Sequence, residues 1–523
     1  MVSSMPVDLQ RELAEALRRA QQAAAPTHIL RTAQLPRRDR TLLQQRGFVV
    51  EIIKGWYALT TPQARPGETT FWHLHFWAFV SAYLHARYGR RYCLSPEHSL
   101  DLWTASTQTP KQLIVLTARG GVFTLKLPND SSVLLYPNRK GLPSVTESKQ
   151  GVQVMPLAVA LLRTTPSYFI RSATNAELAL RMVRIEELSR VLLAGPVNVT
   201  AAGRIAGGLR HLGLTDSASR LEADLLAAGI AIKPQNPFEG PGRLPVGSVL
   251  QSPYAGRIEA MWSRMRPDVL KHFPAPPCAM PEQSRYLHRV NEIYTHDAYH
   301  SLSIEGYQVT PELIQRIADG AWNPSANPQD QEQANAMAAK GYREAFGQVL
   351  ASLGDIWRGR PPGKVVDRDL QGWYRALFSP SVQSNILPVS ALAGYRERRV
   401  FIRGSEHVPP AIEAVPALME ALFSALTQEP SPAVRAVLGH FIFVFIHPYS
   451  DGNGRIGRFL MNLMLASGGY SWTVIRVDRR REYMAALEKA SVHGEISDFA
   501  KFVADEMKAS AKLRPFQHKR SLV

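Results

Sequence analysis

A segment dense in proline and glycine interrupts this chain of 523 residues near its middle. Prolines recur every few residues from Pro234 to Pro281, and Gly240 and Gly242 stand among them. Proline lacks a backbone N–H and glycine is conformationally free, so neither a long helix nor a sheet strand continues easily through such a segment. We therefore expect a connector with one short helix near Arg257–Met265. We also expect several domains, because the chain exceeds one ordinary hydrophobic core.

The two sides of the connector differ in pattern. Ahead of it, helical and strand-like segments alternate, whereas after it apolar residues recur at helical spacing almost to the end. The expected fold is a multidomain one, with an α+β N-terminal half and a mainly α C-terminal half. The expected regions are a first module at 1–62, an α+β region at 63–233, the connector at 234–282, a helical extension at 283–363, a helical core at 364–507 and a basic tail at 508–523.

Composition excludes several classes of protein. Hydrophobic and charged residues make up 45% and 20% of the chain, a balance typical of soluble globular proteins. The longest strongly apolar stretch, Phe441–Ile446, is far shorter than the roughly 20 residues that cross a bilayer. Asp8 and Glu12 interrupt the region where a signal peptide needs a continuous apolar segment. Two cysteines, Cys93 and Cys278, cannot build a disulfide framework or a Cys-rich metal site. We expect a soluble cytoplasmic protein.

The net charge of +17 is concentrated in the first 250 residues, with a smaller excess in the C-terminal tail. A localised positive field favours a polyanionic partner, of which nucleic acid is the commonest. The alternative is a basic surface that serves only solubility.

The first sixty residues have the pattern of a winged helix-turn-helix. In order, they show an amphipathic helix, a short second helix before Pro36, a basic helix closed by a glycine, and two strands of a hairpin around Lys54-Gly55. These elements are expected at Leu9–Ala24, Ile29–Leu35, Arg37–Gly47, Phe48–Ile52 and Trp56–Leu59. Such a module places its basic helix in a major groove and its hairpin near a phosphate. The candidate DNA-binding residues are Arg37, Arg38, Arg40, Gln44 and Lys54. The segment resembles the N-terminal winged helix of AbiEi-type antitoxins, which bind DNA. A winged helix used for protein contacts is the alternative.

The rest of the N-terminal half shows no clear chemistry. Phe71–Phe79 is dense in aromatic residues and contains His73 and His75, whose spacing on a helix points them to different faces. We therefore predict core packing there rather than a metal pair. Gln112–Thr117 and Ser132–Tyr136 have the pattern of strands.

One short segment near the C-terminus combines residue types suited to phosphate chemistry. It reads His447-Pro448-Tyr449-Ser450-Asp451-Gly452-Asn453-Gly454-Arg455-Ile456-Gly457-Arg458. A buried helix is expected at Pro432–Ile446 before it, and a second apolar helix at Ile456–Ala466 after it. A glycine-rich turn that opens onto a helix N-terminus is a ready anion site.

The polar residues of this segment suit nucleotidyl or phosphoryl transfer. His447 has the pKa range of a base that deprotonates a hydroxyl, and Asp451 is a hard oxygen ligand suited to Mg²⁺ between protein and phosphates. Arg455 and Arg458, three residues apart, lie on one side of the following helix and suit a polyphosphate. A base, a metal carboxylate, a phosphate cradle and two arginines thus occur together.

The segment resembles the Fic family motif, HPF-x-(D/E)-GNGR-x-x-R, and departs from it only in Tyr449 for the usual Phe. Gly394-Tyr395-Arg396, Val400-Phe401-Ile402 and His407-Val408-Pro409-Pro410 resemble the family's flap, a β-hairpin that aligns the target segment. The resemblance covers roughly Lys364–Met507, with a helical extension from about Arg285. It implies a helical Fic (Fido) core that transfers AMP from ATP to a Ser, Thr or Tyr hydroxyl of a protein and releases pyrophosphate.

The resemblance also implies a role for each matching residue. His447 would be the catalytic base and Asp451 the Mg²⁺ ligand. The nucleotide-binding set would be Gly452, Asn453 and Gly454 at the α- and β-phosphates, Arg455 at the β-phosphate, Arg458 at the γ-phosphate, and Tyr483 in the part that closes over the base.

A second motif implies control of this activity. Ser301-Leu302-Ser303-Ile304-Glu305-Gly306 matches the family's inhibitory pattern, (S/T)-x-x-x-E-(G/N). In relatives this glutamate pairs with the second arginine of the motif, which is Arg458 here, and prevents productive seating of the γ-phosphate. Carboxylate and phosphate then compete for one guanidinium. The alternative is that Glu305 sits in a solvated helix turn. The resemblance also leaves open a role of Glu305 in AMP removal.

Two other functions remain open from the sequence. The chain would be a DNA-binding regulator if the Fic core served as a nucleotide sensor, and the basic helix at 37–46 is the feature that distinguishes this reading. Transfer of another phosphate-bearing group is the other alternative. Expected partners are ATP, a protein with a target hydroxyl, DNA through the winged helix, and a second copy of the chain, because the family often dimerises; no membrane partner is expected.

Overall fold

The computed structural model describes residues 7–25, 27–60, 70–195, 197–238, 253–319, 333–402 and 404–515. The chain forms two compact units, one made of Met1–Arg257 with Phe401–Val408 and the other of Ile258–Val400 with Pro409–Val523. The break falls inside the region expected as a connector. Part of that region, and the last residues of the basic tail, lie outside the described residues.

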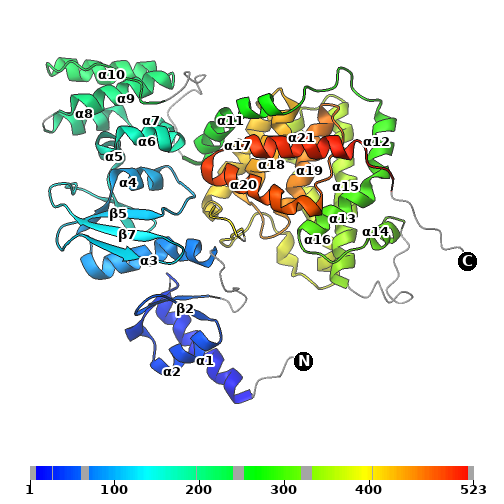
Figure 1. The fold of residues 1–523 in the computed structure, drawn as a ribbon, viewed down its shortest axis with the longest axis horizontal. Helices are drawn as coiled ribbons and strands as arrows, with labels where there is room; N and C mark the ends of the chain where they lie inside the picture. The colour runs from blue at the N-terminus through cyan, green and yellow to red at the C-terminus, as the bar shows by residue number, and fades with distance from the viewer. Residues whose placement is uncertain are drawn as a thin grey trace, which may run out of the picture. The chain divides into compact units, whose positions relative to one another are not determined.

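The N-terminal unit begins with a small helical and three-stranded module (Figure 1). Its elements are α1 (Val7–Ala24), β1 (Ile29–Arg31), α2 (Arg37–Gln45), β2 (Val49–Ile53) and β3 (Trp56–Leu59), and the strands pair antiparallel in the order β1-β3-β2. The hairpin of β2 and β3 is present as expected. The segment before Pro36 is a strand and a single 3-10 turn at Thr32–Gln34 rather than a full helix, because Leu30 pairs with Tyr57 of the hairpin.

A four-stranded sheet forms the next part of this unit (Figure 1). Its strands are β4 (Tyr92–Leu94), β5 (Gln112–Thr117), β6 (Phe123–Lys126) and β7 (Ser132–Pro137), in the order β4-β5-β7-β6 with β5 and β7 parallel. Both strands expected from the sequence are confirmed. Helix α3 (Thr70–Tyr88) buries its aromatic residues against Leu113 and Val115 of this sheet. The prediction that the aromatic segment forms core is therefore confirmed.

Short helices complete the N-terminal unit. They are α4 (Pro96–Trp103), α5 (Leu157–Arg163), α6 (Pro166–Arg171), α7 (Ala173–Met182), α8 (Ile185–Leu193), α9 (Val199–His211) and α10 (Thr215–Ala227), with a hairpin of β8 (Glu147–Lys149) and β9 (Val152–Val154) before α5. These helices share one apolar core that also takes Cys93 and Leu116 from the sheet. The sheet is thus covered on both faces.

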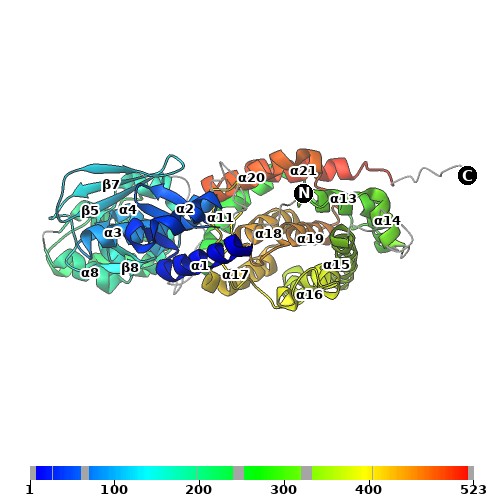
Figure 2. The same cartoon turned by 90° about the horizontal axis from the view of Figure 1, so that it is seen from below.

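The C-terminal unit is helical in its described residues (Figures 1 and 2). Its helices are α11 (Pro253–His272), α12 (Gln283–Glu292), α13 (Tyr294–Ile304), α14 (Pro311–Ala318), α15 (Gln333–Trp357), α16 (Pro362–Gln383), α17 (Val415–Gln428), α18 (Pro432–Ile446), α19 (Asn453–Ser467), α20 (Arg480–His493) and α21 (Ser497–Ser510). The helix within the connector, α11, is longer than expected. Ile258, Met265 and Val269 are buried at helical spacing, so the apolar side of the helix continues past the expected end at Met265.

Helices α18 and α19 are the centre of this unit. Nearly every residue of both helices is buried, and Gly439 of α18 lies close to Leu460 of α19. Ser431 starts α18 by accepting a hydrogen bond from the Val434 amide, and Pro432 occupies its first turn. The loop between the two helices is consequently held at both ends by the packed core, and this loop carries the motif residues.

Candidate active site

The loop between α18 and α19 begins at His447, which has a left-handed backbone conformation (φ 52°, ψ 59°). This conformation costs a residue with a Cβ atom on the order of 1–2 kcal/mol, so surrounding contacts must hold it. It ends α18 and turns the chain away from the helix axis. The His447 amide still donates to the Phe443 carbonyl at 3.0 Å, which ties the turn to the last turn of α18.

The His447 ring is oriented by its own helix. Its Nδ1 lies 3.2 Å from the Val444 carbonyl oxygen, which can only accept, so Nδ1 carries the proton and Nε2 keeps its lone pair. Burial lowers the pKa of His447, and the Arg396 guanidinium lowers it further, against the opposing effect of Glu305 and Asp451. The ring is therefore neutral near pH 7 and able to accept a proton at Nε2.

The turn after His447 is braced by the side chain of Asn453. Its amide oxygen accepts from the Tyr449 amide at 3.0 Å, and its amide nitrogen donates to the Tyr449 carbonyl at 2.8 Å. Tyr449 stacks on Tyr374 with ring centroids 3.8 Å apart and donates its hydroxyl to Gln371. The extra hydroxyl of this tyrosine is thus accommodated. The side chain of Asn453 shapes the loop, and its backbone N–H lies in the first turn of α19.

Gly452 precedes α19 with φ +81°, and a Cβ atom built on it would lie 2.7 Å from the Phe378 ring. The positive φ angle and the short distance to Phe378 therefore both require glycine at this position. We expect Gly452→Ala to lower the free energy of unfolding by about 1–3 kcal/mol, measured by denaturant unfolding. Gly347→Ala is the control, because a Cβ atom there meets nothing within 4 Å and the residue lies inside α15. Equal unfolding midpoints for Gly452→Ala and the unaltered chain would contradict this prediction.

Asp451 and Arg455 lie together at the start of α19. Asp451 is 63% exposed, accepts from the Gly452 amide through Oδ1, and faces the Arg455 guanidinium through Oδ2 at 3.2 Å. Arg455 is buried, and its guanidinium lies 5.0 Å from the ring centroids of both Tyr307 and Phe378. No group of three or more His, Cys, Asp or Glu side chains suited to a metal occurs in the described ranges. Asp451 is a single exposed carboxylate beside the N-terminus of α19, and a carboxylate is the hard oxygen ligand that Mg²⁺ takes together with phosphates and water.

Arg458 is buried and makes three hydrogen bonds to the end of α13. Its Nε donates to Ser301 Oγ at 2.8 Å, and its Nη2 donates to the Ser301 carbonyl at 3.0 Å and to Glu305 Oε1 at 2.7 Å. The pairing expected between Glu305 and the second motif arginine is therefore present. Ser301 joins the pair through both its hydroxyl and its carbonyl.

Glu305 follows the last residue of α13 and occupies the N-terminus of α19. Its side chain is 28% exposed, and a Cβ atom built on Gly454 would lie 2.2 Å from its Oε1. Burial alone would raise the pKa of Glu305, but Arg458 and Arg455 outweigh burial and lower it. An ionised carboxylate thus rests on the helix N-terminus, where an anionic ligand would bind.

Helix α13 is fixed at its C-terminal end. Gly306 has φ +92°, which turns the chain after Glu305. Arg480 Nε donates to the Ile304 carbonyl at 2.9 Å, and His300 Nδ1 accepts from the Val477 amide at 3.2 Å. These contacts place Glu305 over Arg458, and the 476–480 loop that makes them had no signal in the sequence.

Tyr483 lies in the first turn of α20 and has a partner in α18 that the sequence pattern did not indicate. It is 2% exposed, and its hydroxyl lies 2.8 Å from His440 Nε2 in α18. Its ring packs against Phe499 and Phe502 of α21. The sequence pattern missed this partner because His440 reads as one residue of an apolar helix. A contact of Tyr483 with a nucleotide base stays a prediction.

The flap region also differs from its expected form. Among the described residues from 394 to 411 the structure has no paired strands, and the bridge of His407 with Gln108 is isolated. Turns and bends stand in place of the expected hairpin, and the carbonyls of Arg398 and Pro410 accept from the side chain of Arg396, so these two carbonyls are not available to a facing strand.

The candidate DNA-binding residues lie on α2 and on the β2–β3 turn. Arg37, Gln44 and Lys54 are exposed. Arg38 pairs with Glu12 of α1 at 2.6 Å. Arg40 lies 5.5 Å from the Tyr57 ring centroid and donates to the Leu35 carbonyl, so its guanidinium holds the module together.

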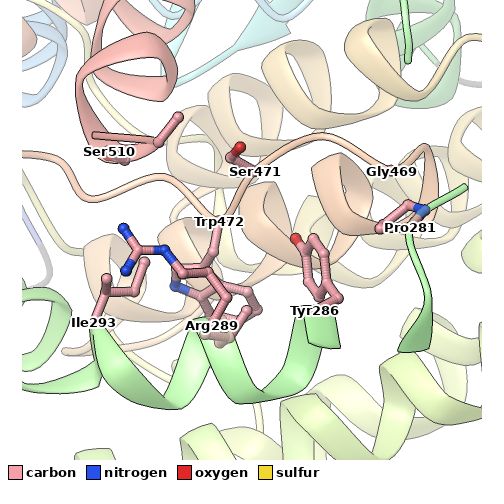
Figure 3. A pocket seen from close by; sticks show the side chains of 10 residues that line it. Pro281, Tyr286, Arg289, Ile293, Gly469, Ser471, Trp472 and Ser510 are labelled. Atoms are coloured by element: carbon pink, nitrogen blue, oxygen red, sulfur yellow. The ribbon is translucent and has the colours of Figure 1, made fainter. Parts of the chain in front are cut away.

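A separate cavity of about 220 Å³ lies in the C-terminal unit (Figure 3). Tyr286 and Arg289 of α12 line it together with Ser471 and Trp472 of the loop after α19, and Ser510 of α21 closes one side. Tyr286 already donates its hydroxyl to the Tyr470 carbonyl at 2.8 Å. None of the lining residues belongs to the 447–458 motif or to the 301–306 segment.

Among the described helices, none is long and apolar enough to cross a membrane.

Comparison with known proteins agrees with this geometry. Residues 367–465 match the profile of the Fic/DOC family. The relatives include "Protein adenylyltransferase Fic" of Nematostella vectensis, 30% identical over 250 residues, which are 44% of this chain and 53% of the relative. The protein of the same name in Drosophila melanogaster is 28% identical over 281 residues, 53% of this chain and 51% of the relative. The chain thus spans about half the length of these curated relatives.

Two solved structures show a more distant likeness. Fic-1 from C. elegans is 19% identical with a TM-score of 0.36, covering 65% of this chain and 95% of that one. A Fic domain containing signaling protein from Bacteroides thetaiotaomicron is 19% identical with a TM-score of 0.35, covering 48% and 94%. The resemblance to the Fic family is confirmed by the profile and by the curated relatives.

Proposed function

We propose that this chain is a protein adenylyltransferase, which transfers AMP from ATP to a hydroxyl of a protein and is inhibited by its own Glu305. The observation that carries the proposal is the arrangement around α19, where a neutral His447 and two buried arginines surround a helix N-terminus. The names of the curated relatives, which match 250 and 281 residues of this chain, support the reaction.

In this reaction the protein supplies a base and a phosphate cradle. His447 Nε2 takes the proton of the target hydroxyl, whose oxygen forms a bond to the α-phosphorus of ATP. The bond between that phosphorus and the bridging oxygen to the β-phosphate breaks, and pyrophosphate leaves with the electron pair. The backbone N–H groups at Gly452–Gly454 stabilise the charge that develops on the phosphate oxygens. A Mg²⁺ ion held by Asp451 would supply further charge compensation on the phosphates.

The arginines must exchange partners before the reaction. Arg455 would leave Asp451 for the β-phosphate, and Arg458 would leave Glu305 for the γ-phosphate. Because Glu305 lies over Gly454 and holds Arg458, ATP cannot seat its phosphates fully while this ion pair persists. The flap residues near 394–410 align the target segment in this proposal.

The position of the label tests the reaction type. The Glu305→Gly chain is incubated with Mg²⁺ and ATP labelled at either the α- or the γ-phosphate, with lysate proteins as acceptors. AMP transfer attaches the α label alone to protein, and intact mass then shows one added AMP on any self-modified chain. Attachment of the γ label would indicate phosphoryl transfer, and no attachment of either label would contradict the proposal.

The exposed residues of α2 favour a second function, binding of DNA by the N-terminal module. Arg37, Gln44 and Lys54 are exposed on the basic helix and the hairpin turn, and Arg38 is held only by an exposed ion pair. We expect the Arg37→Ala/Arg38→Ala chain to bind duplex DNA more weakly, and the slope of log affinity against log salt to fall by about 2.

The control for DNA binding is Arg11→Ala, which removes an exposed arginine of α1 that pairs with Glu15. Binding is measured by fluorescence anisotropy over a salt series with the full chain. An unchanged slope in the Arg37→Ala/Arg38→Ala chain, or an equal loss in Arg11→Ala, would argue that α2 does not face DNA. A cytoplasmic location and a dimeric state stay predictions.

A further inference from the structure

Arg396 is a buried arginine that the proposed reaction does not use directly. It is 3% exposed, and its charge has no carboxylate partner within an ion-pair distance among the described residues. Its backbone N–H and its guanidinium donate to four backbone carbonyls, those of Pro448, His447, Arg398 and Pro410. A buried guanidinium is costly unless its donors are satisfied, so this side chain has a structural task.

The donors of Arg396 reach the turn of the catalytic base. Its backbone N–H donates to the Pro448 carbonyl at 2.8 Å, and its Nε donates to the His447 carbonyl at 2.9 Å. Two consecutive carbonyls of the turn are thus bound by one residue. Pro448 has no N–H to donate, so the turn cannot stabilise itself through that residue. The left-handed conformation of His447 therefore depends on contacts from outside the turn.

The same guanidinium also binds two other carbonyls of the flap region, one near its start and one near its end. Its Nη2 donates to the Pro410 carbonyl, and its Nη1 donates to the Arg398 carbonyl at 3.4 Å. One planar group consequently connects the segment on either side of the flap with the backbone of His447. A lysine has one nitrogen at its end and cannot reproduce this fork of separated donors.

We propose that Arg396 is a positioning residue, which holds His447 in its strained turn and couples the flap to the catalytic base. This inference rests on the proposed AMP transfer, since the base matters only if the reaction occurs. In this proposal Arg396 acts through the backbone of His447 and Pro448.

The charge of Arg396 adds a second effect that can be measured. After burial and the Val444 hydrogen bond, the Arg396 guanidinium is the largest influence on the pKa of His447, and it lowers that pKa. Glu305 and Asp451 act in the opposite direction. Loss of the arginine charge therefore raises the pKa of His447, so the base becomes protonated at a higher pH and activity is lost earlier as the pH falls.

Two substitutions separate position from charge. Both substitutions are made in the Glu305→Gly chain, so that parent and variant differ only at residue 396 in the charges that act on His447. We expect Arg396→Met to lower kcat by at least about 10-fold with KM for ATP within about 2-fold, and to move the acid limb of the kcat profile to higher pH. Arg396→Lys keeps the charge without the fork, so we expect lower kcat with the acid limb close to that of the parent.

Arg435, in the first turn of α18, offers a matched control. It is buried at the N-terminal end of α18, and its guanidinium donates to the Glu429 and Pro430 carbonyls and to Ser467. Arg435→Met therefore removes a buried guanidinium that binds carbonyls but lies at the other end of α18. We expect it to lower stability without moving the acid limb. If Arg435→Met moved the acid limb as far as Arg396→Met does, general loss of stability would explain both shifts, and the proposal would be overturned.

Two further measurements keep the test decisive. NMR titration of ¹³C-labelled histidine, with the His447 signal assigned by its loss in His447→Ala, reports the pKa of the ring without any activity. Added guanidinium ion is expected to restore part of the kcat of a folded Arg396→Ala chain.

A folded Arg396→Met chain with the parent's kcat, acid limb and His447 pKa would overturn the proposal. If Arg396→Met does not fold, a kcat of Arg396→Lys equal to that of the parent would overturn the proposal. An inactive Glu305→Gly parent would instead reject the proposed function.

Discussion

Replacing Glu305 with glycine is expected to raise the rate of AMP transfer by about 10- to 100-fold, a change of about 1.4–2.7 kcal/mol in the barrier. The substitution removes the carboxylate that binds Arg458 at 2.7 Å and lies over Gly454. The guanidinium is then free to bind the γ-phosphate, and the helix N-terminus is open to phosphate oxygens. Breaking a fully buried ion pair costs more than this range, but the Glu305 side chain is 28% exposed, which reduces the effect.

The rate is measured as AMP incorporated into protein at saturating ATP, for the unaltered chain and for each variant. Glu305→Gln is the matched comparison, because it keeps the shape of the side chain but removes its charge, and we expect a rate between the other two. Glu312→Gly is the control for a glycine in place of an exposed glutamate of the neighbouring helix α14. Equal rates for the unaltered chain and Glu305→Gly would show that the ion pair does not restrain the site.

Replacing His447 with alanine in the Glu305→Gly chain is expected to lower kcat by about 10²- to 10⁴-fold, the range for loss of a general base. The reason is the orientation of the ring, whose Nδ1 proton is bound by the Val444 carbonyl so that Nε2 is the accepting atom. Arg455, Arg458 and the glycines of the loop remain, so the affinity for ATP is expected to change by about 2-fold or less.

Calorimetric titration measures the affinity for ATP, and the transfer assay measures the rate of AMP transfer, so the two together separate binding from the chemical step. His493→Ala serves as the control, because that histidine lies in the last turn of α20, away from the motif. A His447→Ala chain that binds ATP and transfers AMP at the parent rate would remove His447 from the role of base. A loss of ATP binding would instead show that His447 is needed for the shape of the loop.

Much of the site could be predicted because its residues are neighbours in the chain. Apolar periodicity predicts the helix at 432–446, and the structure has α18 at the same residues. The backbone chemistry of proline and glycine predicts that the chain turns at Pro448 and before the next helix. The N-terminal strands at 112–117 and 132 onward follow in the same way from local patterning. The pairing of Glu305 with Arg458 was reached only through a family motif, since 153 positions separate the two residues.

Other parts of the site depend on packing that a local pattern does not encode. Tyr483 is a polar aromatic residue on a helix, and only the approach of α20 to α18 brings its hydroxyl to His440. The segment before Pro36 has the composition of a helix start, but pairing with the hairpin makes it a strand. In each case the competing partner comes from a distant part of the chain.

The sequence alone determined which chemical groups stand together, because a histidine, a carboxylate, a glycine-rich turn and two arginines lie within one helix–loop–helix whose geometry is local. The tertiary structure decided which partners those groups have at rest. It placed Glu305 on Arg458, bound the carbonyl of His447 to Arg396, and set Arg455 between Tyr307 and Phe378. The physical reason is that a side chain's type is fixed by its own residue, whereas its hydrogen-bond partner is fixed by whichever distant segment the packed core brings within about 3 Å.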